Sequence, residues 1–98
     1  MEIQRLRNLT TGILHTRMQD IYEDIEHLTG SKGVMTHQLG MASKALEPYL
    51  RNVATDPRLW DGRHDPSHTG EIEVPPLQGA DLAEFWARYD DEVEKWLS

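Results

Sequence analysis

The segment from Trp60 to Glu71, WDGRHDPSHTGE, concentrates side chains that are capable of chemistry. It combines three carboxylates, two histidines and an arginine in twelve positions. Histidine and carboxylate groups can transfer protons, bind metal ions or hold a polar ligand. The segment is therefore a candidate for a reaction centre or for a binding loop.

The spacing of these residues argues against catalysis. His64 and His68 are four positions apart, but Pro66 lies between them and opposes the helix that would align them as zinc ligands. The chain has no cysteine, and it contains no calcium-loop, nucleophile-elbow, phosphate-loop or dinucleotide-binding pattern. We therefore predict no catalytic residue, no metal site and no cofactor, with metal-dependent hydrolysis as a second alternative.

Two further histidines suggest an anion site, because His15 and His37 each stand at the start of a predicted helix. Free backbone N–H groups and the positive end of the helix dipole attract anions there. With Arg7, Arg17 and Lys32, these histidines could surround a small anionic ligand such as a nucleotide; the competing interpretation is that they only orient helix starts. The predicted ligand-binding residues are His15, Thr16, His37, Asp61, Asp65, His68 and Glu71.

Negative charge is concentrated towards the C-terminus. Residues 1–70 hold nine acids and eight bases, whereas residues 71–98 hold eight acids and two bases. Such a field repels phosphate backbones, so direct nucleic-acid binding is not expected, and a basic protein surface is the more natural partner. The predicted partner-binding residues lie on the first and last helices that follow the N-terminal segment; they are Asp20, Glu23, Asp24, Asp90, Asp91 and Glu94.

The residue pattern of the N-terminal half predicts a hairpin followed by a helix. Thr10, Thr11 and Gly12 separate two short apolar runs, which favours a hairpin, with a helical turn over residues 3–7 as the competing interpretation. Thr16 and Gln19 have the spacing of a capping box, and apolar residues then recur every three or four positions up to the helix stop at Gly30.

The C-terminal half predicts two more helices around a long loop. One helix starts at Thr36 and is expected to kink or break near Glu47, because Pro48 falls inside its pattern. Residues 56–80 are expected to be loop, with an exposed strand over 71–74. The last helix, at about residues 81–97, carries a stripe with Phe85, Trp86, Tyr89 and Trp96 that is expected to pack in the core, with a partner groove as the alternative.

These elements predict one small α+β domain of 98 residues. It has about three helices and a small antiparallel sheet made from the N-terminal hairpin and residues 71–74; the alternative is a mainly α domain. No apolar run is long enough to span a bilayer, and the N-terminus lacks the apolar core of a signal peptide. The expected location is therefore the cytoplasm, without membrane contact.

The chain also resembles a family of short uncharacterised proteins encoded by tailed bacteriophages and prophages. The resemblance extends up to the Glu84-Phe85-Trp86 stretch. Its motifs are RNLTTG at residues 7–12, LHT at 14–16, MTH at 35–37, TDPR at 55–58, WDG at 60–62 and HTGE at 68–71. The resemblance implies a phage accessory protein made in the cytoplasm of an infected bacterium, and it supplies no catalytic residues.

Charge and resemblance together predict an inhibitor that binds a bacterial host or anti-phage defence protein stoichiometrically through acidic surfaces, by analogy with anti-CRISPR proteins. The alternative is an oligomeric sponge that sequesters a small anionic signalling ligand such as a cyclic nucleotide. Self-association into a homo-oligomer is left open by the sequence.

Overall fold

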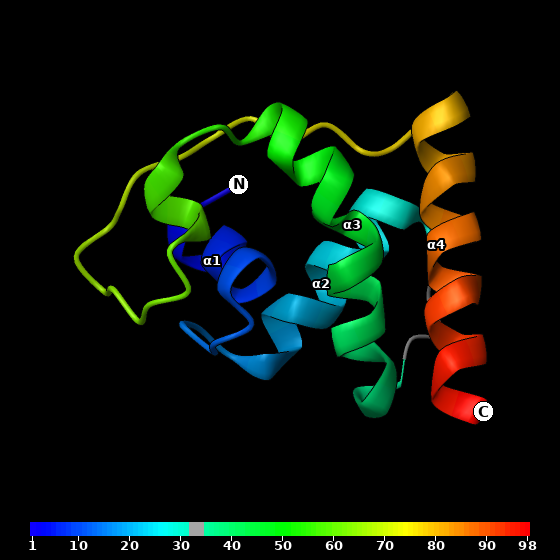
Figure 1. Ribbon diagram of the computed structural model, residues 1–98. Helices are drawn as coiled ribbons and strands as arrows, with labels where there is room; N and C mark the ends of the chain where they lie inside the picture. Colours follow the sequence, from blue (N-terminus) through cyan, green and yellow to red (C-terminus); the bar gives the residue numbers. More distant parts are fainter. Residues whose placement is uncertain (32–34) are drawn as a thin grey trace.

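The protein is mainly α-helical in the computed structural model, which describes residues 1–31 and 35–98 (Figure 1). The predicted α+β class is therefore wrong, and the mainly α alternative is confirmed. Within these two ranges the chain forms no strand. Its elements are α1 (Ile3–Thr11), α2 (Met18–Thr29), the 3₁₀ helix η1 (Thr36–Gln38), α3 (Leu39–Val53), the 3₁₀ helix η2 (Pro57–Trp60) and α4 (Gly79–Leu97).

Helix α1 replaces the predicted N-terminal hairpin. Ile3, Leu6 and Leu9 recur every three residues, so they share one face of a helix, and all three are buried. Gly12 does not turn a hairpin; it adopts a left-handed conformation with φ 71° and ends the helix. The competing prediction of a helical turn over residues 3–7 was thus the better one.

Pairing between the N-terminus and residues 71–74 is reduced to a single antiparallel bridge between Glu2 and Glu71. The backbone N–H of Ile3 donates to the carbonyl of Gly70 at 2.9 Å, and that of Ile72 donates to the carbonyl of Met1 at 2.9 Å. The predicted sheet is wrong because α1 begins at Ile3 and consumes the backbone groups that a second strand would have used.

Helix α2 begins one residue later than the predicted capping box allows. Arg17 is its N-cap, and the Asp20 carboxylate, not Gln19, accepts the Arg17 backbone N–H at 3.3 Å. Gly30, with φ 75°, ends the helix as predicted. The expected cap at Thr16 and Gln19 is therefore wrong, whereas the expected stop is confirmed.

Helix α3 runs through Pro48, so of the predicted kink or break near Glu47 the break is wrong. Proline inside a helix costs about 3 kcal/mol, because it removes one backbone donor and crowds the preceding turn. Ala45, Leu46 and Leu50, on both sides of the proline, are buried. Packing of this central helix outweighs the local cost.

Helix α4 lies along one side of α3, while α1 and α2 lie on the other side (Figure 1). Phe85 anchors α4 and is 2% exposed, with Trp86 and Tyr89 packed partly against the same core. The predicted core stripe fails at its end, because Trp96 is 59% exposed and Leu97 is 71% exposed. Across the described ranges, no helix combines the length and the apolar character needed to cross a membrane.

The two glycines at positions 12 and 40 give a matched test of these helix assignments. Gly12→Ala is expected to destabilise the protein by about 1 to 2 kcal/mol, because alanine is strained in the left-handed conformation. Gly40→Ala, inside α3, is expected to stabilise it by about 0.5 to 1 kcal/mol. Space is open at both positions, so only backbone conformation differs. Urea unfolding of the two variants measures the signs, and equal signs would contradict the assignment.

Candidate functional site

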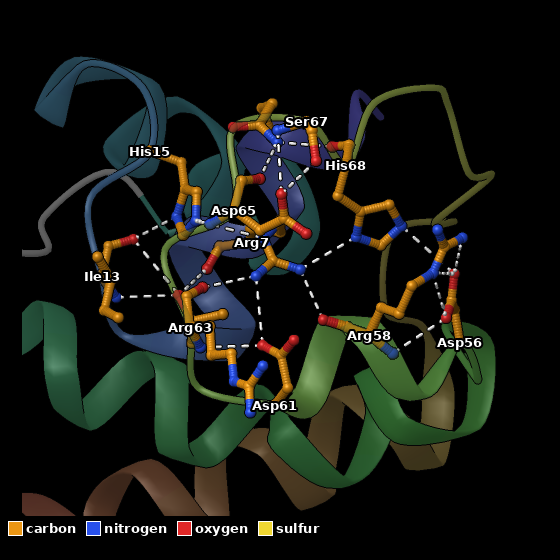
Figure 2. A network of polar contacts seen from close by, with 12 residues as sticks. Arg7, Ile13, His15, Asp56, Arg58, Asp61, Arg63, Asp65, Ser67 and His68 are labelled. Atoms are coloured by element: carbon orange, nitrogen blue, oxygen red, sulfur yellow. Dashed lines mark hydrogen bonds and ion pairs between the residues drawn. The ribbon is translucent and has the colours of Figure 1, made fainter.

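The guanidinium of Arg7 organises the segment that contains the candidate site residues (Figure 2). Arg7 projects from α1 and is fully buried. An arginine has five N–H donors, and here its three nitrogens make five hydrogen bonds. Nε donates to His15 Nε2 at 3.2 Å. Nη1 donates to the Arg58 carbonyl at 2.6 Å and to His68 Nδ1 at 3.0 Å. Nη2 donates to Asp61 Oδ1 at 3.3 Å and to the Arg63 carbonyl.

These bonds indicate the tautomer of the half-buried His15 and of the buried His68. His15 Nε2 accepts from Arg7 and from the Asp65 backbone N–H at 3.2 Å, so the proton lies on Nδ1, which donates to the Ile13 carbonyl at 2.8 Å. His68 Nδ1 accepts from Arg7, so its proton lies on Nε2. That nitrogen lies 3.3 Å from Asp56 Oδ2 without the alignment of a hydrogen bond. Both rings therefore act as acceptors for Arg7.

Local turns bring the loop carboxylates into the same network. The Asp56 carboxylate accepts from the Arg58 backbone N–H at 3.0 Å, and the Asp65 carboxylate accepts from the Ser67 backbone N–H at 3.1 Å. Bonds from the Arg58 side chain and backbone lower the pKa of Asp56 to about 2. The pKa of Asp61 is lowered, chiefly by the Arg63 backbone N–H, and that of Asp65 is lowered, chiefly by the Ser67 hydroxyl. The loop is thus ordered by bonds to ionised carboxylates.

These lowered pKa values predict that the stability of the protein depends on pH. The three carboxylates bind protons less readily in the folded than in the unfolded protein, where the pKa of an aspartate is about 3.9. Their contribution to stability is present above about pH 4 and is lost as the pH falls towards about 2. We expect the urea midpoint to drop over this range, and Asp56→Asn to give a flatter profile than the wild type. An unchanged slope in the variant would contradict the role of Asp56.

The predicted acidic face of α2 is largely turned towards Arg5 of α1. Arg5 Nη2 lies 2.7 Å from Asp24 Oδ1 and 3.3 Å from Glu23 Oε2, and Arg5 Nη1 lies 3.8 Å from Asp20 Oδ1. Asp20 and Asp24 are each 6% exposed. Burial raises the pKa of Asp24 against the pull of Arg5, whereas hydrogen bonds from Thr16 and Arg17 lower that of Asp20. Two of the six predicted partner-binding acids are therefore structural.

The predicted acids on α4 have the opposite placement. Asp90, Asp91 and Glu94 are all exposed. Asp91 Oδ2 lies 3.2 Å from Lys95 Nζ on the next turn. Neither Asp90 nor Glu94 has an ion-pair partner in the described part of the chain. Asp90 and Glu94 are therefore available to a partner, whereas the exposed Asp91 is paired within the helix.

The remaining predicted ligand residues do not converge on the Arg7 network. Thr16 accepts a hydrogen bond from Asn8 Nδ2 at 2.7 Å. His37 lies in η1 and stacks on Trp96 with ring centroids 5.0 Å apart. Glu71 forms the exposed bridge with Glu2. Lys32 lies outside the described residues. Of the predicted ligand residues, the network around Arg7 contains His15, Asp61, Asp65 and His68.

A groove of about 540 Å³ opens beside this network, between the end of α1, the start of α2 and α3. Residue spacing does not reveal this groove, because it predicts Leu14 in a hairpin and Met18 on the apolar face of a helix. Both side chains line the groove and remain 47% and 43% exposed. Lys44 and Arg51 of α3 line its edge.

The two histidines of the Arg7 network are engaged in internal contacts. Both nitrogens of His15 are occupied, and His68 is 4% exposed. Both nitrogens of His15 and Nδ1 of His68 therefore have partners inside the protein. In residues 1–31 and 35–98, no three His, Cys, Asp or Glu side chains are placed to hold a metal ion.

Comparison with known protein families finds a match in the N-terminal part of the chain. Neither a curated protein nor a solved structure matches it. A family model described as a domain of unknown function, DUF7736, matches residues 1–61, which make up more than half of the 98-residue chain. The match runs from α1 to the end of η2 and includes Arg7, His15 and nearly all of the groove lining. The chain therefore belongs to the DUF7736 family.

Proposed function

We propose that the protein is a phage-encoded accessory protein that binds and stoichiometrically inhibits a bacterial host or defence protein. The observation that carries the proposal is the exposed acidic face of α4, formed by Asp90, Asp91 and Glu94. Residues 71–98, which include this face, hold eight acids and two bases. A basic surface that normally holds nucleic acid is the complementary partner.

The proposed contact surface contains fewer acids than the six predicted from the sequence. Asp20 and Asp24 of α2 are committed to Arg5 and Arg17, so their charge is compensated within the molecule. Long-range attraction by α4 is expected to raise the association rate and to weaken with added salt.

The proposal is tested by pull-down of the tagged protein from a bacterial host, followed by affinity measurement on the recovered partner. The triple variant Asp90→Asn, Asp91→Asn, Glu94→Gln is expected to lose capture, and binding of the wild type is expected to weaken as salt rises. Glu2→Gln, Glu71→Gln, Glu73→Gln is the matched control, because it removes three exposed charges outside α4. A complex that is unaffected by salt and by the α4 variant would refute the proposal.

The alternative of an anionic ligand has less support. His15 and His68 point into the protein towards Arg7, and His37 stacks on Trp96. A ligand in the groove would instead meet Lys44 and Arg51. Calorimetry with cyclic nucleotides tests this alternative, and binding that is lost in Lys44→Ala would revive it.

A further inference from the structure

His15 joins three segments of the chain through one ring (Figure 2). Its Nε2 lies 3.2 Å from Arg7 Nε of α1 and 3.2 Å from the backbone nitrogen of Asp65, which is 50 positions later in the chain. Its Nδ1 lies 2.8 Å from the carbonyl oxygen of Ile13, in the connection between α1 and α2. The half-buried imidazole therefore helps to hold the loop of residues 61–68 against α1 and against this connection.

A second proton on His15 is incompatible with these contacts. An imidazole with both nitrogens protonated has two donors and no acceptor. Its Nε2–H would face the Nε–H of Arg7 and the backbone N–H of Asp65, and a second positive charge would lie beside the buried guanidinium. Histidine is the side chain that most readily changes its charge on moderate acidification. A protonated His15 must therefore leave its place in the network.

The carboxylates near His15 have other partners. Asp61 Oδ1 lies 3.3 Å from Arg7 Nη2, and the Asp65 carboxylate accepts two hydrogen bonds from Ser67. The exposed ring of His64, which stacks on His15 with centroids 4.7 Å apart, brings no negative charge. The charged and titratable side chains around His15, on α1, at the start of α2 and in the loop, are those of Arg7, Asp20, Asp61, Arg63, His64 and Asp65.

The second histidine of the network has different surroundings. His68 Nδ1 also accepts from Arg7, but Asp56 Oδ2 lies only 3.3 Å from its Nε2. That carboxylate would offset a positive charge on the ring of His68. The two histidines are therefore unequal, and only His15 lacks a neighbouring carboxylate contact of this kind in the part of the chain that the structure describes.

We infer that His15 is a pH-sensitive switch between a closed and an open arrangement of the loop. At neutral pH the ring accepts from Arg7 and Asp65, and the loop is closed. On acidification the protonated ring moves away from both donors, and residues 61–68 separate from the connection between α1 and α2. Ile13 and Leu14, beside His15 in the chain, line the groove, so the same event changes one wall of the groove.

This switch goes beyond the proposed function and does not depend on it. It involves none of the acids of α4, and it is measured on the purified protein alone. Failure of the switch would therefore leave the proposed inhibitor untouched, and the reverse also holds.

Hydrogen exchange of the Asp65 amide, followed by NMR at pH values from 7.5 to 5.0, measures the closed arrangement. After correction for the intrinsic effect of pH on exchange, we expect its protection to fall by about tenfold or more as the pH decreases. The ring signals of His15, recorded in the same samples, should change over the same pH range. A wild type that keeps full protection down to pH 5.0, or a His15 ring that gains its proton without loss of protection at Asp65, would overturn the inference.

His15→Gln assigns the effect to this ring, because a glutamine oxygen can accept from Arg7 and Asp65 but does not titrate. We expect this variant to have the same protection at pH 7.5 and at pH 5.0. His27→Gln is the matched control, since it removes an exposed histidine of α2 outside the network and should keep the acid response. Circular dichroism verifies that both variants fold. A response that persists in His15→Gln, or that disappears in His68→Gln alone, would contradict the assignment to His15.

Discussion

Arg7→Met is expected to lower the free energy of unfolding by about 3 to 5 kcal/mol, the cost of removing one partner from a buried charged network. Methionine keeps most of the side-chain volume but provides none of the donors. It leaves Asp61 without its buried cation, and it leaves two carbonyls and His68 Nδ1 without their Arg7 donor, while His15 Nε2 keeps only the Asp65 N–H. Chemical denaturation gives the loss, which is large against the roughly 5 to 15 kcal/mol that stabilises a typical domain.

Two further variants distinguish the loss of the hydrogen-bond network from the loss of one positive charge. Arg58→Met removes a side chain that is 68% exposed and paired with Asp56, so a loss of stability far smaller than that of Arg7→Met is expected. Arg7→Lys keeps the charge but lacks the planar five-donor fork, so it should behave more like Arg7→Met than like the wild type. If Arg7→Lys were as stable as the wild type, the hydrogen-bond geometry described above would be wrong.

This network explains why the chemistry of residues 60–71 was visible in the sequence whereas its role was not. The residue types and the turn signals indicated a loop, but they did not reveal the hydrogen bonds that hold it. The central residue lies more than fifty positions earlier in the chain, and its direction depends on α1 being a helix. Once Ile3, Leu6 and Leu9 define the buried face, Arg7 lies four residues after Ile3 on that same face. A buried-face arginine was thus the available signal, and the predicted hairpin concealed it.

The helices that were predicted well are those whose local signals agree with one another. Gly30 ends α2, and α4 begins only two residues before its predicted start. Local rules failed where tertiary packing decided the outcome, as at Pro48 inside α3. They also failed at Trp96, where helical spacing predicted a buried side chain although the residue is 59% exposed.

The charged residues illustrate the same limit. Asp24 and Asp90 look alike in sequence, since both lie on acidic stretches of amphipathic helices. Only the position of Arg5 on the neighbouring helix distinguishes them: it binds Asp24 at 2.7 Å, whereas Asp90 faces solvent. Helix packing therefore decides which acidic side chains stay available at the surface. Counting charges along the sequence overestimates their number.

Phe85→Ala tests whether α4 belongs to the same folding unit as the family-matched residues 1–61. Phe85 is 2% exposed and lies in one core cluster with Leu46, Leu50 and Leu77. Truncating a buried phenylalanine costs about 3 to 5 kcal/mol. We expect that loss in a single cooperative urea transition, with circular dichroism and tryptophan fluorescence changing together.

Arg88→Ala is the control on the same helix, because its exposed pair with Glu84 is worth about 0.5 kcal/mol or less. If α4 were a separate appendage, Phe85→Ala would release it at low urea while residues 1–61 stayed folded, and the two signals would diverge. A single transition would instead show that the acidic face of α4 is held rigidly by the core of the DUF7736 domain. Rigid placement lets those carboxylates meet a partner without the entropic cost of ordering a tail.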